Sequence, residues 1–110
     1  MPSAVVAITG ASGSQYSVRL IEALVNAGWD IFLTVTREGA INLKLECGIT
    51  PEDLAERHGI RLEENQNLAA KSASGSARFD AYVICPASGT TIGKIAAGIS
   101  DNLATRSAIV

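Results

Sequence analysis

The chain has 110 residues, of which 47% are hydrophobic and only 5% aromatic, so it holds enough apolar material for one folded domain. The formal net charge is −2 and the basic residues are scattered, which argues against a nucleic-acid-binding stripe. There is no apolar run of membrane-spanning length, and the segment 1–8 has no basic residue of a signal peptide, so we expect a cytoplasmic protein with no membrane contact.

The first half of the chain predicts strands and helices in alternation. The apolar run 4–8 is short, continuous and followed by glycine, as in a strand buried on both faces. Apolar residues then recur at helical spacing over 14–27, and Gly28 ends this helix. A second strand is predicted over 31–36 and a second helix over 38–46.

The second half begins with a strong helix start. Thr50 is the expected N-cap and Pro51 the first helical residue, followed by two acids, and the helix is predicted to end at Gly59. The remaining predicted elements are a loop over 61–76 with room for a short helix, a third strand over 81–85, a turn over 86–91, and helices over 92–97 and 101–108.

This alternation predicts a parallel sheet with helices on both faces, a flavodoxin-like or Rossmann-like three-layer α/β/α fold. Three or four strands are few for an open sheet, and the apolar segment 103–110 ends without a cap. We therefore expect residues 1–110 to form a single domain that is incomplete at its C-terminus, and we expect the chain to self-associate.

Three predicted strand ends carry small polar residues. They are Thr9-Gly10-Ala11-Ser12-Gly13-Ser14, Thr36-Arg37 and Pro86-Ala87-Ser88-Gly89-Thr90-Thr91. Glycines permit close backbone approach, and hydroxyls and free N–H groups at a helix start attract anions. Because ligands bind at the carboxyl ends of parallel strands, these loops predict a site for a phosphate-bearing ligand. The alternative is that they are ordinary helix caps.

The first loop also matches the opening of many short-chain dehydrogenases, but the rest of their pattern is missing. Tyr16 stands where their fingerprint has a third glycine, and no Tyr-x-x-x-Lys pair exists. The second strand ends in Thr36-Arg37 and not in the acid that holds a ribose, so NADP binding through Arg37 stays open only as a weaker alternative.

Cys47 and Cys85 are the two cysteines, far apart in the sequence. In a reducing compartment we expect both to be free and packed as small apolar side chains. Only His58 could join them as a metal ligand, so we expect no metal site.

A series of short motifs resembles the UbiX-type flavin prenyltransferases. The motifs occur in the family's order over almost the whole chain, at residues 9–16, 45–46, 73–76, 83–91 and 100–103, with Arg106. The resemblance implies an FMN-binding domain. It also implies an enzyme that transfers a dimethylallyl group from dimethylallyl phosphate to FMN and supplies the prenylated FMN to a partner decarboxylase.

The resemblance further implies a homo-oligomer, typically a dodecamer, that needs no metal. Members of the family continue well past the position of Val110, and that later part supplies the residues that bind the donor phosphate. An FMN-dependent reductase of the same superfamily and a non-catalytic FMN-binding module remain as alternatives.

Individual residues take their expected roles from the resemblance. Ser12, near the reacting flavin nitrogen, and Glu46, an acid that handles protons, are the expected catalytic residues. A carboxylate could do this if burial raised its pKa. The expected FMN-binding residues are Thr9, Gly10, Ala11, Ser12, Thr36, Ser88, Gly89, Thr90 and Thr91. The family usually has Cys where this chain has Ala87.

Overall fold

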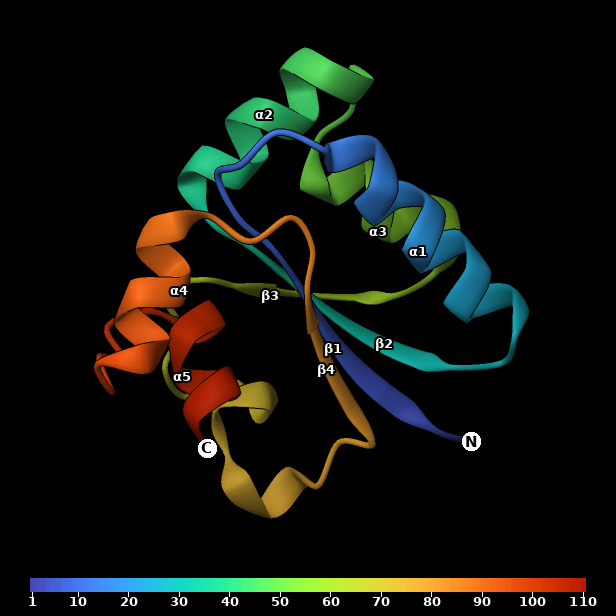
Figure 1. Cartoon of the computed structure of the whole chain (residues 1–110). Coiled ribbons are helices and arrows are strands. Elements are labelled where there is room, and N and C mark those ends of the chain that lie inside the picture. Colours follow the sequence, from blue (N-terminus) through green and yellow to red (C-terminus); the bar gives the residue numbers. More distant parts are fainter.

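Four parallel strands form one sheet, seen in a computed structural model that describes residues 1–110 (Figure 1). The strands are β1 (Ser3–Ile8), β2 (Asp30–Val35), β3 (Arg61–Glu64) and β4 (Ala81–Ile84), and their order across the sheet is β3-β2-β1-β4. This is the order of the first strands of a doubly wound sheet, in which the chain builds outward from β1 and then returns to its other side.

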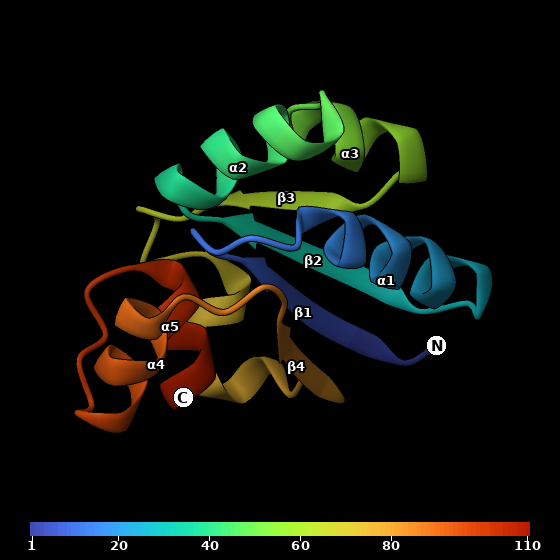
Figure 2. The ribbon, with the colours of Figure 1, turned by 45° about the horizontal axis from the view of Figure 1, so that its top comes forward.

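Helices cover both faces of the sheet (Figure 2). One face carries α1 (Ser14–Asn26), α2 (Arg37–Cys47) and α3 (Pro51–His58). The other carries α4 (Gly89–Ala96) and α5 (Leu103–Ile109), with the short 3-10 turns η1 (Lys71–Ala73) and η2 (Gly75–Ala77). The change of face follows from right-handed crossovers that run in opposite directions from the middle of the sheet. The predicted three-layer α/β/α fold is confirmed.

The core lies between the two central strands and the first three helices. Strand β1 is buried along its whole apolar run, as the continuous pattern predicted. Ile21 of α1, Leu43 of α2 and Leu54 of α3 are fully buried against it. These contacts hold the three helices on the sheet. Helix α2 begins directly after β2, at the edge where the strands end.

Local signals place most helix ends correctly. Thr50 caps α3 by accepting from the Asp53 backbone N–H at 3.1 Å, and the Asp53 side chain accepts from the Thr50 backbone N–H. Gly59 ends the helix with a left-handed backbone at φ 63°. No helix combines the length and the apolarity needed to cross a membrane.

The prediction of a loop over 61–76 is wrong in its first part, because β3 lies there. Its sequence, Arg-Leu-Glu-Glu, has no strong apolar alternation, and it becomes a strand by pairing with the free edge of β2. Arg61 forms an ion pair with Asp30 at 2.6 Å and lies over the Phe32 ring at 4.7 Å. Charged side chains of this kind are typical of an edge strand.

Two predictions for the last third of the chain differ from the structure. Helix α4 begins at Gly89 rather than at residue 92, because the Ser88 side chain caps it. The segment 103–110 exposes less apolar surface than expected, since Leu103 and Ala104 are buried and only Ile109 and Val110 are exposed.

Cys47 and Cys85 are both free thiols, as predicted.

Candidate functional site

The strand order brings two of the predicted loops together. β1 and β4 are neighbours, and the helices that follow them, α1 and α4, lie on opposite faces of the sheet. In a doubly wound sheet this change of direction opens a crevice at the carboxyl ends of the strands, which is where ligands bind. Loop 9–14 and loop 86–88 therefore form the two sides of one candidate site.

Thr9 ties these two loops to each other. Its hydroxyl donates to the carbonyl oxygen of Pro86 at 2.6 Å and accepts from the backbone N–H of Ser88 at 2.7 Å. The residue is fully buried. The sequence suggested that Thr9 contacts the ligand, but its polar atoms face inward, and it acts by positioning Ser88.

A cavity of about 320 Å³ opens at the strand ends, and no hydrophobic residue lines it. The lining includes five of the residues expected to bind the cofactor, namely Gly10, Thr36, Ser88, Thr90 and Thr91. Gly89 lies between two of them as the first residue of α4. Ala11 and Ser12 belong to the same loop as Gly10 but do not line the cavity.

The start of α4 presents hydrogen-bond donors at this cavity. Ser88 accepts from the Thr91 backbone N–H at 3.1 Å, and its hydroxyl donates to the Thr91 side chain at 2.8 Å. The backbone N–H groups of Gly89 and Thr90 have no partner in the protein. Free N–H groups at the positive end of a helix form an anion site. The lining also holds one acid, Glu38, beside one base, Lys94.

Lys94 is the one basic residue among those that line the cavity, and the sequence analysis missed it. Its ammonium group lies 3.1 Å from an Asp101 carboxylate oxygen. Helical spacing could have identified Lys94 from the sequence, because it follows Thr90 and Thr91 by four and three residues and so lies on their side of α4.

Two glycines let α2 approach the end of β1 closely. A Cβ on Gly39 would lie 2.5 Å from the carbonyl oxygen of Ile8, and a Cβ on Gly10 would lie 2.4 Å from Cβ of Glu38. Thr36 caps α2 by accepting from the Gly39 backbone N–H at 3.0 Å. Glycine is therefore required at both positions, and it brings Thr36 to the edge of the cavity.

Glu46, in the last turn of α2, contacts loop 9–14 directly. Its carboxylate accepts from the Ser12 hydroxyl at 2.9 Å, from the Ser14 backbone N–H at 2.8 Å and from the Gly13 backbone N–H at 3.2 Å. Gly13, the N-cap of α1, has φ 115° and supplies no side-chain cap. Glu46 thus caps α1 from a neighbouring helix.

These hydrogen bonds stabilise the ionised form of Glu46. The backbone N–H of Ser14, followed by the Ser12 hydroxyl and the Gly13 backbone N–H, holds the pKa of Glu46 below its ordinary value of 4.5. The expectation that burial raises this pKa is wrong, because the side chain is exposed. The carboxylate is ionised at neutral pH and serves as a fixed anion at the start of α1.

Arg37 lies in a different environment from the one that NADP binding requires. It lines a cavity of about 280 Å³ together with three acidic residues, Glu52, Glu63 and Glu64. An arginine that accommodates a ribose 2′-phosphate would have to do so among three carboxylates, which repel that phosphate. This arrangement disfavours the NADP alternative.

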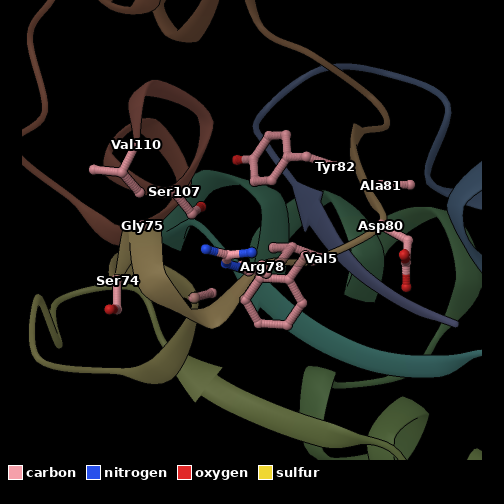
Figure 3. Close-up of a pocket in the computed structure, with 11 residues that line it drawn as sticks. Val5, Ser74, Gly75, Arg78, Asp80, Ala81, Tyr82, Ser107 and Val110 are labelled. Carbon is pink, nitrogen blue, oxygen red and sulfur yellow. The ribbon is translucent and has the colours of Figure 1, made fainter. Parts of the chain in front are cut away.

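A further cavity of about 310 Å³ lies away from the strand ends (Figure 3). Residues of β1, β4, α5 and the 3-10 segment line it, among them Val5, Tyr82, Ser107 and Arg78. Burial raises the pKa of Tyr82, whose hydroxyl donates to the carbonyl oxygen of Ala104. None of the predicted site residues lines this cavity, and it lacks a helix start, so the candidate site is the one at the strand ends.

Comparison with known proteins places these features in a family. The family model described as Flavoprotein matches residues 2–110. A flavin prenyltransferase UbiX of Archaeoglobus fulgidus is 39% identical over 106 residues, which cover 96% of this chain and 58% of the relative.

Two solved structures of similar proteins have the same fold as this chain. A crystal structure of AnUbiX (PadA1) in complex with FMN and dimethylallyl pyrophosphate matches with a TM-score of 0.92 and 27% identity, over 97% of this chain and 56% of the other. A dodecameric FMN-dependent UbiX-like decarboxylase from Escherichia coli O157:H7 matches with a TM-score of 0.91 and 29% identity, over 96% of this chain and 58% of the other. The chain thus spans little more than half the length of these relatives.

Proposed function

The chain belongs to the Flavoprotein family, and on that premise we propose that it is the FMN-binding part of a flavin prenyltransferase. The observation that carries the proposal is the polar cavity at the carboxyl ends of β1 and β2 and the start of α4, which combines an open helix start with hydroxyl groups, one lysine and one glutamate. The relative named UbiX and the AnUbiX complex with FMN and dimethylallyl pyrophosphate support it.

The FMN phosphate is proposed to bind at the start of α4. The free backbone N–H groups of Gly89 and Thr90 donate to it, as does the hydroxyl of Thr91, which Ser88 orients by donating its own proton to the Thr91 oxygen. Thr36 reaches the same cavity from the end of β2, and Lys94 supplies the positive charge. Each hydrogen bond to a charged phosphate oxygen is worth about 1.5–3 kcal/mol.

The flavin ring is proposed to lie along Gly10, Ala11 and Ser12. Gly10 lines the cavity at the end of β1, and Glu38 packs where a Cβ on Gly10 would lie. Ser12 donates its proton to Glu46, so its oxygen offers only lone pairs to a neighbouring group. Bound in its reduced form, FMN would supply a nucleophilic N5: the N5–carbon bond would form as the donor's carbon–oxygen bond breaks and phosphate leaves, and the bond at C6 would form as the alkene takes up a proton and C6 loses one.

The proposed donor is dimethylallyl phosphate, the proposed recipient of the product is a partner decarboxylase, and the proposed compartment is the cytoplasm. We also propose a homo-oligomer, as in the dodecameric UbiX-like relative. Ile41 and Leu45 support self-association, because they lie one turn apart on α2 with 51% and 78% of their surface exposed.

The FMN site is tested by removing its hydroxyls. Ser88→Ala combined with Thr91→Val should weaken FMN binding at least about tenfold, because the charge-assisted hydrogen bond from Thr91 is lost together with the Ser88 cap that holds the start of α4. Fluorescence quenching of FMN gives the affinity. Thr50→Ala is the matched control, since it removes the same kind of helix cap from α3, outside the cavity. Equal FMN affinity in the double variant and the parent would overturn the site.

The activity is tested with a protein as long as its relatives, because their chains extend beyond the matched region. FMN reduced with dithionite is incubated without oxygen with dimethylallyl phosphate or, in a second arm, with dimethylallyl pyrophosphate, and the extracted flavin is examined by mass spectrometry. A flavin heavier by one dimethylallyl group supports the transferase. Tight FMN binding without that product in either arm would favour the non-catalytic module.

A further inference from the structure

Asn102 lines the polar cavity at the strand ends, and the FMN contacts proposed above do not include it. It is the N-cap of α5, which lies on the same face of the sheet as α4 (Figure 2). The residue before it, Asp101, pairs with Lys94 of α4 at 3.1 Å. One wall of the cavity therefore comes from the start of α5, in addition to the loops that follow the strands.

The capping interaction fixes the orientation of the Asn102 amide group. Its Oδ1 accepts from the Thr105 backbone N–H and from the Thr105 hydroxyl, each at 2.9 Å. The reverse orientation would set the amide NH₂ against the backbone N–H, so Oδ1 has to face the helix. The Nδ2 group makes no hydrogen bond within the protein and is free to donate into the cavity.

The start of α5 is held in place by a residue far away in the sequence. The Leu103 backbone N–H donates to the carbonyl oxygen of Asn65 at 2.7 Å, and the Ala104 backbone N–H donates to Asn65 Oδ1 at 3.0 Å. Leu103 and Ala104 are themselves fully buried. Asn65 directly follows β3, so these bonds tie the start of α5 to the sheet. Asn102 thus presents its amide group from a fixed position.

We propose that Asn102 is a further ligand-binding residue of this site and that its Nδ2 group donates to the phosphate of the bound ligand. The proposal rests on the proposed FMN site and adds a contact to it. Thr90, Thr91 and Lys94 line the same cavity and offer donors as well. A group that can donate but has no free acceptor suits an anionic oxygen, which accepts several hydrogen bonds at once.

Variants that keep the cap but change the group facing the cavity test this contact. Serine and aspartate cap helices about as well as asparagine does, so Asn102→Ser and Asn102→Asp should unfold in urea with the parental free energy. The first variant removes the amide donor, and the second replaces it with a carboxylate. Thr50→Asp is the matched control, because it places a carboxylate at the cap of α3, outside the cavity.

FMN affinity, measured by fluorescence quenching, should fall from the parent to Asn102→Ser and again to Asn102→Asp. Loss of one charge-assisted hydrogen bond weakens binding about tenfold in the serine variant. The aspartate variant binds still more weakly, because its carboxylate repels the phosphate. Thr50→Asp should bind FMN as the parent does. Riboflavin, which lacks the phosphate, should show the same affinity for Asn102→Asp and the parent.

Parental FMN affinity in Asn102→Asp would overturn the proposal. An equal loss in Thr50→Asp, or a loss of riboflavin affinity as large as that of FMN, would overturn it too. If Asn102→Asp does not fold, the serine variant decides, and parental FMN affinity in that variant overturns the contact.

Failure of the parent to bind FMN would reject the proposed function separately. The Asn102 contact is then judged by titration with inorganic phosphate, followed by phosphorus NMR. Weaker phosphate binding in Asn102→Ser than in the parent supports the contact, and equal results in the two proteins overturn it.

Discussion

Replacement of Thr9 by valine tests the connection between the two loops of the site. Valine has nearly the same shape as threonine but neither donates nor accepts hydrogen bonds, so the change removes the bonds to Pro86 and Ser88 and little else. The Pro86 carbonyl oxygen keeps one partner, the Thr9 backbone N–H at 3.1 Å. The Ser88 N–H keeps none.

The expected loss of stability follows from these partners. Two hydrogen bonds contribute about 0.5–1.5 kcal/mol each, and leaving the Ser88 N–H without a partner adds about 1–3 kcal/mol. Since these terms overlap, Thr9→Val should lower the free energy of unfolding by about 2–4 kcal/mol, a large part of the 5–15 kcal/mol typical of a domain. Ser88 also loses its fixed position, so FMN affinity should fall with stability.

Urea unfolding followed by Trp29 fluorescence measures the change, because Trp29 packs against the core. Thr34→Val is the control: Thr34 is also buried, but its hydroxyl makes one long bond, 3.4 Å to Asn65. This variant should lose less than about 1 kcal/mol. Equal losses in the two variants would refute the argument that Thr9 joins the loops.

Three further predictions concern α2 and α4. Gly39→Ala should destabilise the fold by about 1–3 kcal/mol in urea unfolding, because its Cβ meets the Ile8 carbonyl oxygen at 2.5 Å. Because the pKa of Glu46 is lower in the folded chain, its stabilising effect is present above pH 4.5 and is lost as pH falls through the folded value. Glu46→Gln should therefore flatten the acid side of the stability–pH curve, and an unchanged curve would contradict the assignment. Lys94→Met should weaken FMN binding about tenfold at low salt, whereas Asp101→Asn should strengthen it by freeing the lysine, both measured by fluorescence titration.

Features that depend on neighbouring residues could be predicted from local patterns. The apolar run of β1, the helical spacing of α1, and the Thr50 cap with Gly59 at the other end of α3 all act within a few positions of the chain. The general place of the site was also predictable, because parallel strands direct all their carboxyl ends to one edge of the sheet.

Contacts between residues far apart in the chain become visible only once the elements are packed together. Arg61–Glu64 is a strand because β2 offers a free edge to pair with, and its own residues do not predict that. Thr9 faces inward because loop 86–88 provides its partners, 77 or more positions away. Glu46 is an ionised cap of α1, and not a buried acid, because core packing brings the end of α2 to three donors that lie 32 or more residues earlier. Such contacts arise from the packing of whole elements, which no local pattern encodes.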